Sequence, residues 1–155
     1  MSELAQRVLA SLQGKTLATA ESCTGGLIGG VLTAVPGSSA VYKGGVISYT
    51  NEIKTAFLGV PEELLQKVGA VSAPVAEAMA QGARERLHTD VAVSVTGLAG
   101  PGGDDFGNPV GTVFIGYADE TGTRSIACHF EGDRESVRCQ AAETALFLIL
   151  RQNNG

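Results

Sequence analysis

The alternation of short β-rich segments with helical segments is the feature that most restricts the fold of this chain. Residues 91–95 (VAVSV) form a short, nearly continuous apolar run, which is typical of a central strand covered on both faces. Helical periodicity surrounds this run, most clearly in residues 74–87 and 133–152. Strands that are interleaved with helices indicate an α/β protein, in which helices cover both faces of one sheet.

The other elements are predicted from the same periodicities and from the glycines and prolines that end them. Residues 119–122 form the turn of a hairpin between the last two strands. The sequence therefore predicts a three-layer α/β/α sandwich on a mixed sheet of about five strands, in a single domain over residues 1–155. The remaining helices are expected over residues 2–12, 25–35, 51–58 and 62–68, and the remaining strands over residues 15–20, 41–49 (bent at Gly44 and Gly45), 110–118 and 123–130.

Charge and cysteine content exclude several classes of function. A net charge of −5 without a basic run gives no electrostatic footprint for nucleic acid. Three cysteines without CxxC spacing, and only two histidines, disfavour a disulfide framework or a metal site. No apolar stretch approaches ~20 residues, and the N-terminal segment lacks the pattern of a signal peptide. We expect a cytoplasmic protein with reduced thiols that has no metal or cofactor and binds no membrane.

Ser22 lies between the first predicted strand and the second predicted helix. Its hydroxyl could cap that helix by accepting an amide hydrogen bond. Alternatively, it could be a nucleophile beside a helix N-terminus whose amides and dipole stabilise an oxyanion. Gly25 and Gly26 favour the second interpretation, because a ligand can approach a backbone without side chains, and Cys23 is a rival nucleophile. The spacing matches neither GxGxxG nor a P-loop.

Lys54 follows the second predicted strand, within the stretch that begins at Tyr49. Thr50 or Asn51 can cap the short helix here, which places Lys54 in or near its first turn. A cation is poorly placed against the helix dipole, and desolvation would also lower its pKa, so Lys54 is a candidate general base. The alternatives are a solvated surface lysine and, for Tyr49, an ordinary half-buried aromatic residue.

A glycine-rich loop, residues 96–103, leaves the central strand and could form an anion-binding nest of successive amides. Arg134, at the start of the last predicted helix, could assist an anion site. The alternatives are a flexible connection and a solvated arginine. In open α/β sheets, ligands bind at the carboxyl ends of strands, so these loops could face one another.

Six segments, taken in order, resemble the CinA C-terminal family, which includes the nicotinamide-nucleotide amidases. The resemblance covers nearly the whole chain. It implies hydrolysis of nicotinamide mononucleotide to nicotinate mononucleotide and ammonia, in pyridine-nucleotide recycling, without a metal. The segments are residues 20–26 (AESCTGG), 48–54 (SYTNEIK), 69–72 (GAVS), 96–103 (TGLAGPGG), 109–113 (PVGTV) and 132–134 (GDR).

The resemblance also assigns roles to individual residues. Ser22 is the nucleophile, Lys54 the base that activates it, and Tyr49 a proton relay or orienting hydroxyl. The chain departs from the family pattern at Asn108. Many members of the family carry a lysine at this position, just before the PVGTV motif. The residues expected to bind the substrate or to stabilise the oxyanion are Glu21, Cys23, Thr24, Gly25, Gly26, Thr96, Gly97, Gly100, Pro101, Gly102, Gly103 and Arg134.

Two other functions fit the same sequence. In the family this domain also occurs fused to a second domain in proteins linked to competence, so a non-catalytic nucleotide-binding or interaction module is one alternative. An amidase for another carboxamide, such as a different pyridine nucleotide, is the other. The resemblance and the low charge are compatible with a homodimer.

Overall fold

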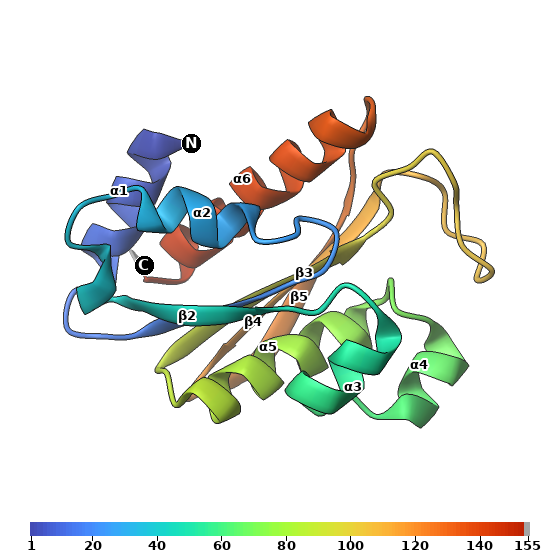
Figure 1. The fold of residues 1–155 in the computed structure, drawn as a ribbon, viewed down its shortest axis with the longest axis horizontal. Helices are drawn as coiled ribbons and strands as arrows, with labels where there is room; N and C mark the ends of the chain where they lie inside the picture. The colour runs from blue at the N-terminus through green and yellow to red at the C-terminus, as the bar shows by residue number, and fades with distance from the viewer. Residues whose placement is uncertain (154–155) are drawn as a thin grey trace.

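A five-stranded mixed sheet forms the centre of the computed structural model, which describes residues 1–153 (Figure 1). Its strands lie in the order β2–β1–β3–β4–β5. β1 (Leu17–Glu21), β2 (Tyr42–Ile47) and β3 (Val91–Gly97) are parallel, and β4 (Thr112–Asp119) and β5 (Gly122–His129) continue the sheet as an antiparallel hairpin. The predicted hairpin and the mixed sheet are thus confirmed.

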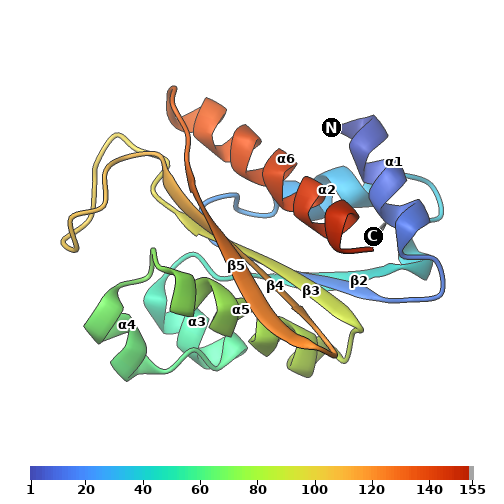
Figure 2. The ribbon, with the colours of Figure 1, turned by 180° about the vertical axis from the view of Figure 1, so that it is seen from behind.

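Helices cover both faces of the sheet, as the two opposite views show (Figures 1 and 2). The α/β/α sandwich predicted from the sequence is therefore confirmed, in a single domain. Among residues 1–153, no helix has the length and apolar character needed to cross a membrane. One layer contains α1 (Ser2–Ser11), α2 (Leu27–Thr33) and α6 (Arg134–Asn153), and the other contains α3 (Asn51–Leu58), α4 (Glu62–Val68) and α5 (Ala73–Leu87).

The two faces of the sheet carry side chains of different size. On β3, Val93 and Val95 pack in the core beneath the α1, α2 and α6 layer, while Ala92 packs in the core beneath α5. α5 lies very close to the sheet: a Cβ placed at Gly116 of β4 would be 2.3 Å from the Ala76 carbonyl oxygen. Small residues on this face therefore permit the close approach of α5.

The main departure from the predicted elements is α2, which is shorter than the expected 25–35. Gly25 and Gly26 adopt φ values of 59° and 101°, which a right-handed helix does not allow. The predicted bend in β2 is confirmed by a shift of register in its pairing with β1. Leu17 pairs with Tyr42, whereas the next residue, Ala18, pairs with Gly44. The other elements begin and end within three residues of their predicted bounds.

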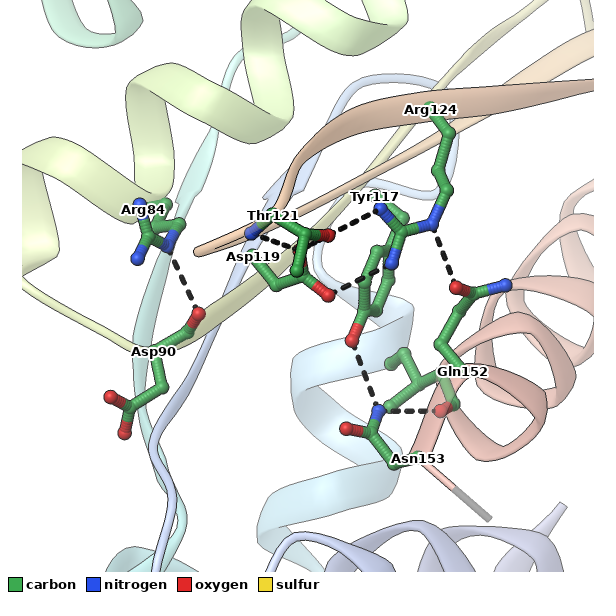
Figure 3. A network of polar contacts seen from close by, with 9 residues as sticks. Arg84, Asp90, Tyr117, Asp119, Thr121, Arg124, Gln152 and Asn153 are labelled. Carbon is green, nitrogen blue, oxygen red and sulfur yellow. Dashed lines mark hydrogen bonds and ion pairs between the residues drawn. The ribbon is translucent and has the colours of Figure 1, made fainter. Parts of the chain in front are cut away.

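Polar contacts fasten the C-terminal end of α6 to the β4–β5 hairpin (Figure 3). Arg124 forms an ion pair with Asp119 at 2.8 Å and donates a hydrogen bond from Nε to Gln152 at 2.7 Å. Its guanidinium carbon also lies 4.8 Å from the centre of the Tyr117 ring, whose hydroxyl accepts a hydrogen bond from Asn153. α6 is thus anchored at the end opposite to Arg134.

Candidate active site

The carboxyl ends of the three parallel strands meet at a cavity of about 470 Å³. Ser22 follows β1, Lys54 follows β2 through the start of α3, and the glycine-rich loop follows β3. Backbone pairing continues beyond the strands, because Ser22 donates its N–H to Val95 and Ser48 donates to Glu21. The three loops that the sequence singled out are therefore brought together, as predicted.

The contact between Lys54 and Ser22 is the central feature of this cavity. Lys54 Nζ donates a hydrogen bond of 2.9 Å to Ser22 Oγ, and further bonds of 2.8 and 3.2 Å to the carbonyl oxygens of Ser48 and Tyr49. The Lys54 side chain comes from the first turns of α3, where Thr50 caps the helix by accepting from the Ile53 N–H. A serine hydroxyl and an amine at this separation have the geometry that a nucleophile–base pair requires.

Lys54 is not the solvated lysine that the sequence left as an alternative, since only 1% of its surface is exposed. Burial lowers the pKa of its ammonium group from 10.5 to about 8, because a charged form is poorly solvated there. The sequence had indicated both the helix dipole and desolvation as causes, and desolvation is the largest cause of the shift. A minority of Lys54, about 9% at pH 7, is therefore already the neutral amine.

Ser22 does not cap α2, which corrects one of the two interpretations of this residue. The helix begins only at Leu27, and Glu21 takes the capping role instead. The buried carboxylate of Glu21 accepts hydrogen bonds from the N–H groups of Ile28 and Gly29, at 2.9 and 3.0 Å, and from the Thr24 hydroxyl at 2.7 Å. Glu21 thus faces α2, away from the cavity.

The amides of α2 are consequently not free to form the oxyanion hole that was expected there. Gly25, one of the expected donors, gives its N–H to the Ser22 carbonyl oxygen. Thr24, Gly25 and Gly26 do not line the cavity, whereas Cys23 does. Burial raises the pKa of the Cys23 thiol to about 11, so Cys23 is a much weaker rival nucleophile than Ser22.

Tyr49 contributes to the site in two different ways. Its carbonyl oxygen accepts from Lys54, while its side chain is 59% exposed and its hydroxyl accepts from Arg134 Nη2 at 3.1 Å. Within residues 1–153 that hydroxyl makes no hydrogen bond to Ser22 or Lys54. The relay role assigned by resemblance stays a prediction, and the contacts favour direct proton transfer between Ser22 and Lys54.

The glycine-rich loop forms one wall of the cavity. Thr96 also lines the cavity, but its hydroxyl donates to the Ala70 carbonyl oxygen at 2.8 Å. Pro101 does not line the cavity. Arg134 fixes the loop by donating from Nη1 to the Gly100 carbonyl at 2.7 Å. The glycines that line the wall are Gly97, Gly100, Gly102 and Gly103.

Some residues that shape the cavity were missed as site residues. Asp104, Asp105 and Phe106 line the end beyond the glycine-rich loop, and Asn51 lines it from α3. The acidic pair was visible in the sequence, but no periodicity shows which way an irregular loop turns. Asn108 donates to Asp104 at 2.8 Å and does not line the cavity, so this departure from the family pattern fastens the loop.

No group of three or more His, Cys, Asp or Glu side chains that could hold a metal ion occurs within residues 1–153.

Comparison with known proteins agrees with the fold. The CinA C-terminal domain family matches residues 1–153. CinA-like proteins from Geobacter metallireducens and Desulfotalea psychrophila are 52% and 51% identical over 90% and 97% of this chain. The chain spans only about a third of the length of these relatives, 34% and 36%.

Solved structures resemble the chain over nearly its full length. A competence-damaged protein (CinA) superfamily protein from Klebsiella pneumoniae superposes with a TM-score of 0.96 at 34% identity, covering 99% of this chain and 97% of that one. The competence/damage inducible protein CihA from Agrobacterium tumefaciens gives a TM-score of 0.94 at 41% identity, covering 98% and 94%. This chain therefore belongs to the CinA C-terminal domain family.

Proposed function

We propose that this chain is an amidase with Ser22 as its nucleophile and Lys54 as its general base. The buried 2.9 Å contact between Lys54 Nζ and Ser22 Oγ is the observation that carries the proposal. A neutral amine has two N–H donors and one lone pair. Because the carbonyl oxygens of Ser48 and Tyr49 accept the two N–H groups, the lone pair is left for the Ser22 proton.

The proposed reaction has two halves. The Ser22 proton moves to Lys54 while Oγ bonds to the carboxamide carbon, and the carbonyl electron pair moves onto oxygen. The oxyanion collapses, Lys54 gives its proton to the nitrogen, the C–N bond breaks and ammonia leaves. Water then attacks the acyl-enzyme and transfers one proton to Lys54, which returns it to Ser22 as the C–O bond to Ser22 breaks. The product leaves as the carboxylic acid, which loses its remaining proton to solvent.

The proposed substrate is nicotinamide mononucleotide, which the family resemblance implies, with nicotinate mononucleotide and ammonia as products. Its phosphate would lie against the glycine-rich loop beside Arg134, both of which line the cavity. Asp104 and Asp105 line the same cavity and would repel a phosphate. The phosphate is therefore expected on the Arg134 side.

The test is ammonia release from nicotinamide mononucleotide, nicotinamide, nicotinamide riboside and the intact dinucleotide. Ser22→Ala and Lys54→Met should each abolish release while the circular dichroism spectrum stays that of the wild type. Ser39→Ala and Lys43→Met change exposed residues at the amino end of β2, away from the cavity, and serve as matched controls. Both controls should release ammonia at the wild-type rate.

Each outcome separates the proposal from its alternatives. Turnover of another carboxamide in the panel would keep the chemistry and change the substrate. Tight nucleotide binding by the wild type without ammonia release from any compound would refute the amidase and favour a binding module. Undiminished release by Ser22→Ala would remove Ser22 as the nucleophile.

A further inference from the structure

The cavity of the candidate active site has one positive and one negative end. Arg134 lines it from the start of α6, in the layer over one face of the sheet (Figure 1). Phe106 lines it from the loop between β3 and β4, and its ring packs against Gly69, which follows α4 in the opposite layer. Asp104 and Asp105 line the cavity beside Phe106. The two charges of the cavity wall are thus held by opposite layers.

Phe106 lies at the boundary between this cavity and a second cavity of about 500 Å³. Phe106 and Asn51 line both cavities. Asn51 is the first residue of α3, and Lys54 follows it by three residues. Residues three apart lie on the same face of a helix, about 5–6 Å from each other. Phe106 therefore shares the cavity boundary with the helix face that carries Lys54.

Hydrogen bonds hold the segment that carries Phe106. The Asp104 carboxylate accepts from the N–H groups of Phe106 and Asn108, at 3.1 and 3.0 Å, and from Asn108 Nδ2 at 2.8 Å. The same Nδ2 donates to the Val71 carbonyl oxygen at 3.1 Å, which fastens the loop to the segment before α5. Phe106 is nevertheless 50% exposed. The loop thus presents an aromatic surface that is fixed in place and open to a ligand.

An aromatic face beside carboxylates attracts a cation. The face of a phenylalanine ring binds positive groups through its quadrupole, and the exposed carboxylate of Asp105 acts in the same direction. Tyr49 is also an exposed aromatic residue of the cavity wall, but its hydroxyl accepts from Arg134, whose charge repels a cation. The proposed substrate carries both charges, because its pyridinium ring is positive and its phosphate is negative.

We infer that Phe106 is a specificity-determining residue that binds the pyridinium ring of the substrate, with Asp105 adding charge attraction. The inference rests on the proposed function, because it takes the carboxamide of that ring to lie at Ser22. It narrows the substrate class to carboxamides on a cationic ring that also bear an anionic group. Phe106 binds the ring, Arg134 attracts the anion, and a neutral carboxamide without an anionic group gains from neither.

The test compares nicotinamide mononucleotide with its reduced form, whose dihydropyridine ring is neutral while the ribose and phosphate are the same. Binding is measured by calorimetry in Ser22→Ala, which removes turnover. In this background, adding Phe106→Leu should weaken binding of the oxidised form about tenfold and of the reduced form about twofold or less. Adding Asp105→Asn should weaken binding of the oxidised form about threefold, because the carboxylate is exposed.

Two matched variants in the same background control for general effects. Phe57→Leu changes a phenylalanine of α3 that is 58% exposed and lines neither cavity. Glu120→Gln removes one negative charge at the exposed β4–β5 turn, at the other end of the sheet. Both should bind the two forms as Ser22→Ala does, and circular dichroism checks that every variant is folded.

The same measurements separate this inference from the proposed amidase activity. If the wild type releases no ammonia, but Ser22→Ala prefers the oxidised form and Phe106→Leu removes the preference, the proposed function fails and the binding role of Phe106 stands. If the wild type releases ammonia, but folded Phe106→Leu leaves the preference unchanged, the amidase stands and the inference is overturned. Equal affinity of Ser22→Ala for the two forms, or binding of neither, would also overturn it.

Discussion

The dependence of activity on pH tests the state of Lys54 most directly. The reactive form is the neutral amine, so kcat/KM should rise with pH as Lys54 loses its proton. With a pKa of about 8, the neutral fraction is about 9% at pH 7 and about 91% at pH 9. We therefore expect a rise of about tenfold between these values, followed by a plateau.

The sign and the size of this effect both follow from burial. Burial disfavours the ammonium form, so the pKa falls, and activity is lost as the pH is lowered through about 8. A lysine that kept its ordinary pKa of 10.5 would instead give a rise of about 100-fold from pH 7 to 9, with no plateau. The two pKa values thus predict rises in kcat/KM between pH 7 and 9 that differ by about an order of magnitude.

The assay measures initial rates of ammonia release from nicotinamide mononucleotide below KM, in buffers from pH 7 to 10. Lys43→Met is the control, because Lys43 is exposed and should leave the midpoint unchanged. A midpoint near 8 in both proteins is the expected result. A rate that keeps rising tenfold per unit up to pH 10, or one that does not change between pH 7 and 9, would refute the argument that burial makes Lys54 a base.

Three substitutions test how the fold supports this site. From pH 7 to 10.5 the unfolding free energy of the wild type should rise by about 3 kcal/mol relative to that of Lys54→Met, because the penalty for burying the ammonium disappears as Lys54 loses its proton. Urea denaturation that shows the same change with pH in both proteins would contradict this. Glu21→Ala should cost about 2 kcal/mol or more by leaving the first amides of α2 unpaired, and a loss below about 0.5 kcal/mol would refute the capping role. Gly82→Ala would place a Cβ 1.9 Å from the Leu58 carbonyl oxygen, so it should lower the unfolding free energy, measured by denaturation, by about 1–3 kcal/mol. Gly30→Ala is the control: its Cβ would meet open space, and the variant should not be destabilised.

Much of the fold and the contact between Ser22 and Lys54 could be predicted, because both follow from local periodicity and one rule of topology. Residues 91–95 were identifiable as a central strand from their unbroken apolar character, and β3 is buried accordingly. Parallel strands place their carboxyl ends at one edge, which brings Ser22 and Lys54 together from segments 32 residues apart.

The supporting contacts could not be predicted, because they depend on the path of irregular backbone. Glu21 reaches the amides of α2 only because Gly25 and Gly26 turn the chain back in a left-handed conformation. Arg138 binds the carbonyl of Cys23, 115 residues earlier in the chain. On the helical pattern alone it is one more polar residue of α6. Neither contact leaves a periodic signal.

Gly45 of β2 connects the fold to the proposed chemistry more closely than the sequence suggests. A Cβ at Gly45 would lie 2.2 Å from the Thr19 hydroxyl oxygen on β1, so only glycine allows the two strands to pair at this point. A shift of that pairing by one residue would turn the following side chains to the opposite face. The pairing ends with Glu21 opposite Ile47, and the Ser48 N–H then bonds to Glu21. This register places the carbonyl oxygens that hold Lys54 directly beside Ser22, so Gly45 is a condition for the contact between Lys54 and Ser22.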